Sequence, residues 1–348
     1  MKLWKTIICM ALALALSLSL VACGGGSSKV TLNVLNWGDY IDPELLRQFE
    51  DETGITVKYT TMTSNEEMLV KLASKDNIYD VCFPSDYLIE KLVADDLLYA
   101  INKDNIPNLK NIDPRFMDLS FDPGNTYSVP YMWGTVGILY NTTMVSDPVD
   151  SWNILWDEKY AGQILMYDSM RDTIGITLKK LGMDINTRSE ADVLAAQEAL
   201  IAQKPLVRAY LTDDIKMELI NGSAAMGVVY SGDAVYCISE NPDLAYAVPQ
   251  EGSNVWFDNI IIPKSSQHTA EAEQFINFLC DAQVAAQNSD YIGFSTPNAE
   301  ALKLMDPSYA EDPTYNPPQD VLDRCQIFQD LGDFVKVFSD AWTKVKAA

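Results

Sequence analysis

Aromatic residues and carboxylates occur together at five places in this sequence, most of them at the end of a segment expected to be a strand. The groups are Trp37, Asp39 and Tyr40; Ser85, Asp86 and Tyr87; Ser169 and Asp172, after a strand that ends near Tyr167; Tyr230 and Asp233; and Trp256 and Asp258. Aromatic faces attract an organic cation by about 0.5–2 kcal/mol per contact. Carboxylates bind its nitrogens through directional, charge-assisted hydrogen bonds, and a buried ammonium without such a partner would be costly. These residue types therefore predict a cation-binding site.

Each group taken alone also has a structural explanation. A tryptophan after a strand often packs in a core, and Asp39, Asp86 and Asp233 are of a type common in helix caps and turns. Arg171 either orients the acids through a salt bridge or lies on the surface. The repetition of the same combination at five places favours a binding site over five separate structural roles.

The segments that would position these groups alternate between strand and helix. Strands are expected at residues 30–35, 55–61 and 79–83, with helices at 43–53 and 65–73 between them. The first helix has Asp42 as a cap, Pro43 in its first turn and Gly54 at its end. Further strands are expected at 128–130, 136–140, 163–167, 225–230, 244–248 and 259–262, and further helices at 173–181, 190–203, 212–220, 270–281 and 335–345.

This order predicts an α/β fold with a mostly parallel sheet and helices on both of its faces. A chain of 348 residues exceeds what one hydrophobic core usually organises, so two lobes are expected. In open sheets of this kind, ligands bind beyond the carboxyl ends of the strands. Most of the aromatic and acidic groups lie at those ends.

The first residues have the layout of an export signal. Lys2 and Lys5 precede an apolar run over residues 6–21, which is short for a membrane span. Residues 20–23 (Leu-Val-Ala-Cys) resemble a bacterial lipobox, in which cleavage after residue 22 leaves Cys23 to be acylated. Residues 23–29 would then be the lipidated cysteine and a flexible tether. The alternative is an ordinary cleaved signal in which Cys23 has no role.

The composition excludes several classes of function. The formal net charge of −24 argues against nucleic acid and anionic lipid as partners. His268 is the one histidine, in a polar run, so histidine-based metal sites and catalytic triads are not expected. The cysteines at positions 82, 237, 280 and 325 lie in apolar surroundings without metal spacing, and buried free thiols are expected. No cofactor and no metal are implied.

Several segments together resemble the polyamine-binding proteins, the spermidine/putrescine receptors of bacterial ATP-driven importers. They are residues 36–40, 79–85, 129–134, 256–258 and 292–298, and the resemblance extends over residues 30–346. It implies a type II periplasmic-binding-protein fold, with two α/β lobes that close on one ligand in the cleft between them. The lobes would comprise residues 30–133 with 260–326, and residues 134–259 with 327–348.

The resemblance also implies roles for individual residues. The family's aromatic contacts match Trp37, Tyr40 and Trp256, and contacts on the next loop match Ser85 and Tyr87. Asp172 matches a glutamate that meets an amine, Asp258 the acid that holds the ligand's central part, and Phe294 a tyrosine contact.

Three positions depart from the spermidine receptors. Ser169 stands in place of an aspartate, Tyr230 in place of a tryptophan, and Phe294 lacks a hydroxyl. Asp233 agrees with the putrescine-type receptors, so the choice between diamine and triamine stays open. The contacting glutamine near the C-terminus matches either Gln326 or Gln329.

The expected function is that of a monomeric receptor anchored through Cys23 on the outer face of the cytoplasmic membrane, or in a periplasm. It would bind a polyamine, close about a hinge and present the ligand to the permease of an ABC importer. A sugar, an anion or ferric iron is an alternative solute, of which sugar is the strongest because sugar sites also combine aromatics with acids. An enzyme such as a glycoside hydrolase is less expected, although paired acids do occur in that class.

Overall fold

The computed structural model describes residues 29–348. The expected export signal, the acylated Cys23 and nearly all of the expected tether lie outside the described residues. No helix in the described part is long and apolar enough to cross a membrane.

The first part of the chain has the predicted alternation of strand and helix. It comprises β1 (Thr31–Trp37), α2 (Pro43–Thr53), β2 (Thr56–Met62), α3 (Asn65–Leu72), β3 (Val81–Cys82) and α4 (Asp86–Ala94). Helix α2 begins as predicted, because the Asp42 side chain accepts the Glu44 N–H. It ends at Gly54, whose φ of 73° is in the left-handed region that glycine adopts freely. Helix α4 was not predicted.

The middle of the chain contains a second set of strands and helices. These are β4 (Ser128–Asn141), β5 (Ile164–Tyr167), α5 (Met170–Lys180), α6 (Glu190–Gln203), β6 (Val207–Leu211), α7 (Ile215–Ile220), β7 (Met226–Tyr230), α8 (Ser231–Glu240) and β8 (Leu244–Ala247). Helix α6 has the predicted bounds, whereas α8 and β6 were not predicted.

The last third of the chain adds one strand and six helices to the described structure. They are β9 (Val255–Ile261), α9 (Thr269–Leu279), α10 (Ala282–Ile292), α11 (Ala299–Leu302), α12 (Pro307–Glu311), α13 (Gln319–Leu322) and α14 (Val335–Ala347). Short 3-10 helices also occur, at Lys103–Asn105, Pro107–Asn111, Pro114–Phe116, Trp152–Trp156, Glu158–Tyr160, Lys204–Leu206 and Gly332–Phe334.

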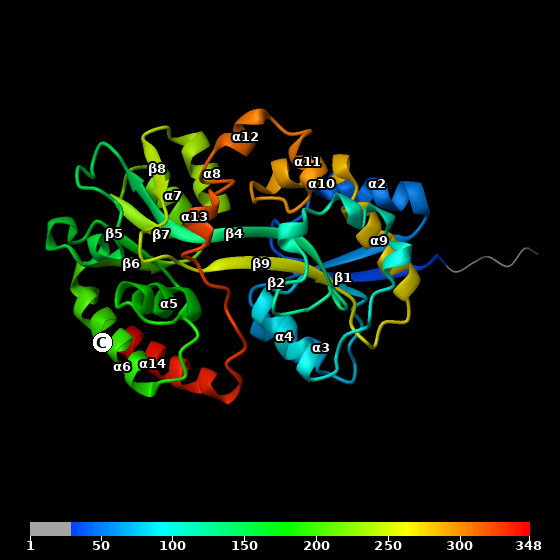
Figure 1. Cartoon of the computed structure of the whole chain (residues 1–348), viewed down its shortest axis with the longest axis horizontal. Coiled ribbons are helices and arrows are strands. Elements are labelled where there is room, and N and C mark those ends of the chain that lie inside the picture. Colours follow the sequence, from blue (N-terminus) through cyan, green and yellow to red (C-terminus); the bar gives the residue numbers. More distant parts are fainter. Residues whose placement is uncertain (1–28) are drawn as a thin grey trace, which may run out of the picture.

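The strands form one continuous sheet in the order β2-β1-β3-β9-β4-β7-β5-β6, with β8 paired to β4. The outer pairs are parallel: β1 with β2 and β3, and β5 with β6 and β7. The central pairings of β4 and β9 are antiparallel. Figure 1 shows β9 and β4 running along the middle of the molecule, with α2, α9 and α10 on one side of the sheet at one end and α5, α6 and α14 near the other end.

Strand β4 joins the two halves of the sheet. Its first half pairs with β9 from Ser128 to Thr135, and its second half pairs with β7 and β8 from Val136 to Asn141. Two short strands were predicted here, but residues 131–135 continue the strand and are buried. Burial on both faces removes the alternation of polar and apolar residues that normally identifies a strand. Strand β4 therefore runs from one half of the sheet into the other.

The described cysteines are all free. Cys82, Cys237 and Cys280 are buried and Cys325 is half-buried, which confirms the predicted free thiols. The described residues contain no group of three or more His, Cys, Asp or Glu side chains that could hold a metal ion.

Candidate ligand-binding site

Asp258 is a buried carboxylate on β9, opposite Met132 of β4. It is 7% exposed. The Tyr40 hydroxyl donates to its Oδ2 at 2.7 Å, and the Ser85 hydroxyl donates to its Oδ1 at 2.6 Å. Burial raises its pKa to about 6, although the two hydroxyl groups act in the opposite direction by stabilising the charged form. Within the described residues, the hydrogen-bond partners of Asp258 are therefore neutral hydroxyl groups, and no lysine, arginine or histidine donates to it.

Asp172 has the same kinds of hydroxyl partner as Asp258. It lies in the first turn of α5 and is 6% exposed. Its Oδ2 accepts hydrogen bonds from Ser169 Oγ at 2.6 Å and Tyr230 OH at 2.8 Å. Burial raises the pKa of Asp172, and the two hydroxyl groups oppose that rise. Among the recorded hydrogen bonds of the described residues, none goes to Oδ1, which leaves that oxygen for a ligand.

A row of aromatic rings connects the tyrosines that serve the two acids. Tyr40 contacts Phe294 with 5.6 Å between ring centroids, Phe294 contacts Trp256 at 5.4 Å, and Trp256 contacts Tyr230 at 5.8 Å. All three contacts are edge-to-face, which aromatic pairs prefer. The rings offer apolar and π surface between Asp258 and Asp172. This is the combination that an alkylammonium compound requires.

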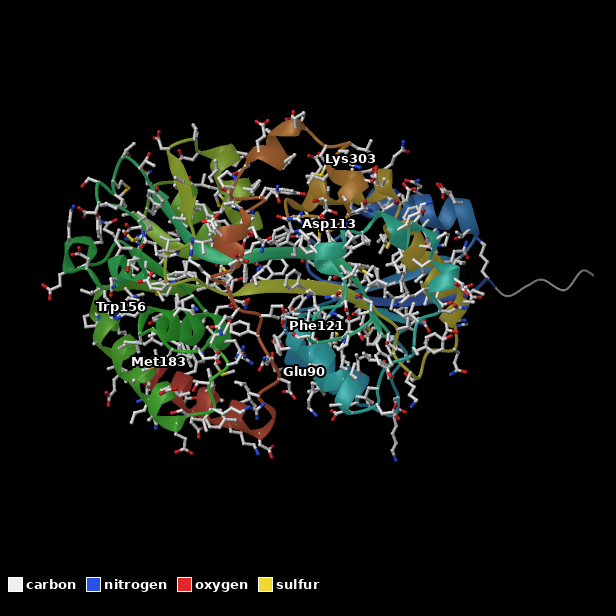
Figure 2. The ribbon with its side chains drawn as sticks, in the orientation of Figure 1. Glu90, Asp113, Phe121, Trp156, Met183 and Lys303 are labelled. Atoms are coloured by element: carbon white, nitrogen blue, oxygen red, sulfur yellow. The ribbon has the colours of Figure 1, made fainter. Side chains whose placement is uncertain are left out.

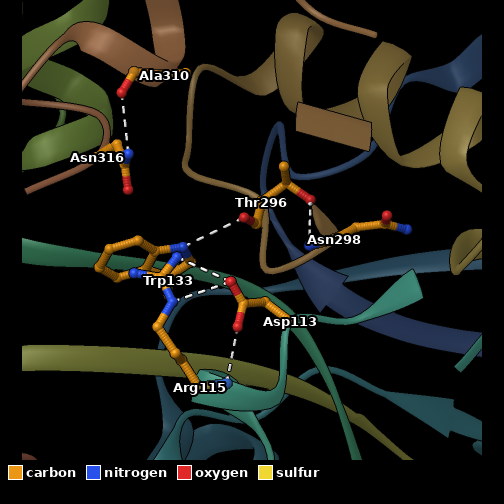
Figure 3. A network of polar contacts seen from close by, with 7 residues as sticks. All are labelled: Asp113, Arg115, Trp133, Thr296, Asn298, Ala310 and Asn316. Atoms are coloured by element: carbon orange, nitrogen blue, oxygen red, sulfur yellow. Dashed lines mark hydrogen bonds and ion pairs between the residues drawn. The ribbon is translucent and has the colours of Figure 1, made fainter. Parts of the chain in front are cut away.

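The loop that carries Phe294 is fixed to β4. Helix α10 ends at Gly293, whose φ is +77°. Trp133 of β4 then donates its backbone N–H to Ser295 O at 3.1 Å and its indole N–H to Thr296 O at 3.4 Å. Figure 3 shows the second contact, together with the hydrogen bond from Asn298 N to the Thr296 side chain. These bonds hold the Phe294 loop in place beside the two acids.

Gly232 allows the Phe294 ring to approach α8. A Cβ at this position would lie 2.1 Å from Phe294 Cδ1, closer than any side chain permits. A similar restriction applies at Gly134, where a Cβ would lie 2.7 Å from the Trp256 ring. The close approach of both rings to the backbone explains why glycine stands at these two positions.

The structure places the other expected site acids differently. Asp39 is exposed, with a φ of 47°. Asp86 is buried, and its oxygens accept the N–H of Tyr87 at 2.7 Å and of Phe257 at 3.1 Å. Burial raises the pKa of Asp86. Asp86 thus stabilises the start of α4 and links it to β9, which is the structural role that its position in a turn allowed.

Asp233 is paired within the protein. Its Oδ1 lies 3.2 Å from Lys216 Nζ, and the side chains of Lys216 and Asp233 are 28% and 13% exposed. Trp37, a half-buried residue, donates its indole N–H to Phe83 O at 2.8 Å. Sequence reasoning did not identify Lys216 as part of this region, because α7 had no recognised motif.

Arg171 is buried and lies among aromatic rings. Its guanidinium carbon is 4.4 Å from the centre of the Phe328 ring and 5.4 Å from that of Tyr87, and its nitrogens donate to Gln329 O at 3.3 Å. Of the two roles expected for Arg171, the surface role is wrong, and the recorded ion pairs of the described residues do not include it. Arg171 instead connects α5 with Tyr87 of α4 and with the segment 323–331.

The segment 323–331 passes between the two halves (Figure 1). Phe328 contacts Tyr87 with 6.4 Å between ring centroids, and Asp330 N donates to Glu90 Oε2 of α4 at 2.8 Å. Figure 2 shows Glu90 beside this segment. Gln326 contacts Lys179 and Asp184 through its side chain. Phe328 was missed from the sequence, although it lies between the two glutamines that were considered.

Two α/β halves joined by crossing strands, with buried acids and aromatics between them, define the class of two-lobed solute receptors. Residues 44–317 match the model of the family described as bacterial extracellular solute-binding protein. The chain belongs to this family.

Relatives of known name are similar over most of the chain. The "Spermidine/putrescine-binding periplasmic protein" of Salmonella typhimurium is 35% identical over 324 residues, which cover 92% of this chain and 93% of the relative. The "Putrescine-binding periplasmic protein PotF" of Escherichia coli is 30% identical and covers 92% of both chains. Among solved structures, a "Putative spermidine/putrescine ABC transporter from Listeria monocytogenes" has a TM-score of 0.87 and 41% identity, covering 91% of this chain and 98% of its own.

Proposed function

We propose that this protein binds a polyamine between its two halves and delivers it to an ABC importer. The observation that carries the proposal is the pair of buried carboxylates, Asp258 and Asp172, each held by one tyrosine and one serine hydroxyl. The names of the relatives, which bind spermidine and putrescine, support the same ligand class.

Each carboxylate would receive one ammonium group of the ligand. The hydroxyl groups orient Asp258 and Asp172 before the ligand arrives, so little rotational freedom is lost on binding. The CH2 groups between the nitrogens would lie along the Phe294 and Trp256 rings, where cation–π attraction adds to the apolar contact. A neutral solute would leave both buried charges unpaired, which disfavours it.

The same acids would couple binding to closure. Asp172 lies on α5, and its partners are Ser169, directly before α5, and Tyr230, at the end of β7. Asp258 bonds instead to Tyr40 and Ser85, which belong to the other half. Without a ligand, closure buries like charges with no counter-ion. A bound polyamine supplies the counter-ions in the closed state only, and therefore shifts the population toward it. No covalent step is involved, and we expect no turnover of polyamines or glycosides.

The setting of the receptor forms part of the proposal. We infer an N-terminal lobe of residues 30–133 and 260–326 and a C-terminal lobe of residues 134–259 and 327–348. Acylation of Cys23 would anchor the monomeric receptor on the outer side of the cytoplasmic membrane, where the importer's permease would bind its closed form. In addition to the two acids, we propose Trp37, Tyr40, Ser85, Ser169, Tyr230, Trp256 and Phe294 as ligand contacts.

Thermal unfolding with a panel of solutes tests the proposal. A ligand at about 100 times its Kd stabilises the folded state by about 2.7 kcal/mol. Putrescine, cadaverine, spermidine and spermine are compared with maltose, glucose, phosphate and glutamate at equal concentration and ionic strength. A rise in Tm with at least one polyamine and with none of the other solutes is expected. A rise with a sugar or an anion alone would overturn the proposal.

A further inference from the structure

Asp233 lies close to the proposed ligand but points its charge elsewhere. It follows Gly232, against which the Phe294 ring packs, so its backbone borders the row of aromatic rings. Its carboxylate nevertheless lies 3.2 Å from Lys216 Nζ on the neighbouring helix α7. Of the recorded ion pairs in the described residues, this one has the least exposed acid. Among the acids of the five aromatic–acid groups, Asp233 alone has a recorded lysine or arginine partner.

The Lys216–Asp233 pair affects a cationic ligand in two ways. The ammonium of Lys216 neutralises the carboxylate that would otherwise attract a second ammonium. A ligand nitrogen that approached Asp233 would also be repelled by Lys216, because two cations would then share one acid. Among the described residues, Asp258 has no lysine or arginine as a hydrogen-bond or charge partner. The neighbouring Arg171 lowers the pKa of Asp172 through its charge, but it forms no ion pair or hydrogen bond with that carboxylate, so the Asp172 oxygens are not occupied by a cation.

We propose that Lys216 is a specificity-determining residue that makes Asp233 unavailable to the ligand. This inference rests on the proposed function, and it assigns ammonium binding to Asp258 and Asp172 alone. Polyamines differ in the number and spacing of their nitrogens, so the number and placement of available acids decide which of them fits. Lys216 reduces that number by one.

The first test is Asp233→Asn in the otherwise unchanged chain, with affinities for the four polyamines measured by calorimetry. Because Asp233 does not face a ligand nitrogen, affinity is expected to change by less than about threefold. Asp258→Asn and Asp172→Asn, measured in parallel, each lower the affinity by at least about tenfold, the loss expected for one charge-assisted hydrogen bond. A tenfold or larger loss with Asp233→Asn would overturn the inference.

The second test is a double-mutant cycle. Lys216→Met frees Asp233, so the affinity for at least one polyamine is expected to rise about tenfold. Adding Asp233→Asn to Lys216→Met then removes the gain, which a general effect on folding would not do. A gain that survives Asp233→Asn, or no gain in a folded Lys216→Met variant, would contradict the inference.

Matched controls separate specificity from loss of charge. Lys216→Arg keeps the ion pair and leaves the affinities as they were. Arg208→Met removes another cation beside α7, whose Nε lies 3.6 Å from Glu218 Oε2 at an exposed position, and it has no effect on the order of affinities. If Lys216→Met does not fold, Asp233→Asn alone decides the question. Absence of polyamine binding by the native chain would instead refute the proposed function.

Discussion

The Tyr40 hydroxyl donates a hydrogen bond to Asp258 Oδ2 at 2.7 Å, although the two residues are 218 positions apart in the chain. Tyr40 follows β1 at the start of the protein, whereas Asp258 lies on β9, after the whole middle of the chain. The contact exists because β9 pairs with both β3 and β4. It sets the orientation of an acid that the proposed ligand requires.

Replacement of Asp258 by asparagine tests that requirement. Asp258→Asn keeps the shape of the side chain and can accept from Tyr40 or Ser85, but it removes the charge. Loss of a charge-assisted hydrogen bond of about 1.5–3 kcal/mol lowers polyamine affinity by about ten- to a hundredfold. Calorimetric titration gives the affinity, and thermal unfolding without ligand shows whether the fold is retained. Unchanged affinity in the folded variant would remove Asp258 from the site.

The affinity is expected to depend on pH, because burial raises the pKa of Asp258 to about 6. The cationic ligand favours the ionised carboxylate, so affinity is highest above pH 6 and falls as the pH drops below it. Asp172, whose pKa burial also raises, acts in the same direction. Titrations from pH 4.5 to 8, repeated with Asp258→Asn, should show a weaker pH dependence in the variant. An equal dependence in both proteins would contradict this origin.

The stability of the ligand-free protein should change with pH in the opposite direction. The folded-state pKa of Asp258, about 6, exceeds the ordinary value of 3.8, so the folded state binds more protons between these pH values. Its contribution to the free energy of unfolding is therefore fully present below about pH 4 and is lost as the pH rises through about 6. Unfolding by urea at pH 4.5 and 7 is measured for the native chain and Asp258→Asn. A difference between the two proteins that does not change with pH would exclude this linkage.

Phe294 is expected to lose its position when Gly232 gains a side chain. Gly232→Ala places a Cβ 2.1 Å from the Phe294 ring in the present geometry, so the ring must rotate or the halves must separate. Polyamine affinity should fall about tenfold or more. Ser239→Ala, an exposed change on the same helix, serves as the control. Equal affinity for Gly232→Ala and the native chain would show that the ring contact is dispensable.

Arg171 is expected to favour the closed form without selecting among ligands. Arg171→Met removes its contacts with Tyr87 and Phe328 and its hydrogen bonds to Gln329 O, but no contact to the proposed ligand. Affinities for all polyamines should fall by a similar factor, about three- to thirtyfold, from contacts worth about 0.5–2 kcal/mol. Small-angle scattering with saturating ligand should still show closure. A change in the order of affinities would instead place Arg171 among the ligand contacts.

Local sequence patterns predicted some of the helices with accurate bounds. Helix α2 has the expected cap and end, and α6 has the expected bounds. Helix α5 begins three residues earlier than predicted, at Met170, because the Ser169 side chain accepts the Asp172 N–H and starts the helix there. Helix α8 was missed, because it begins with Ser231 and Gly232, which have low helix propensity. Tertiary packing of Gly232 against Phe294 explains that choice of residue.

The partners of the acids were less predictable than their presence. The sequence indicated that Asp258 and Asp172 belong to a cation site, but their hydrogen bonds depend on how distant segments meet. Asp86 and Asp233 have the same local pattern as these two acids. Yet Asp86 binds backbone N–H groups, and Asp233 binds Lys216 of a helix that no motif marked. Only the three-dimensional arrangement separates acids that are available from acids that are already paired.

The most direct measurement is isothermal titration of the ligand-free protein, beginning at Gly24, with putrescine, cadaverine, spermidine and spermine in separate experiments. Tight binding of at least one of them at a ratio of one to one, lost in Asp258→Asn, is the result expected for a polyamine receptor. Absence of heat and of competition with all four, from protein shown to be folded and free of ligand, would contradict the account.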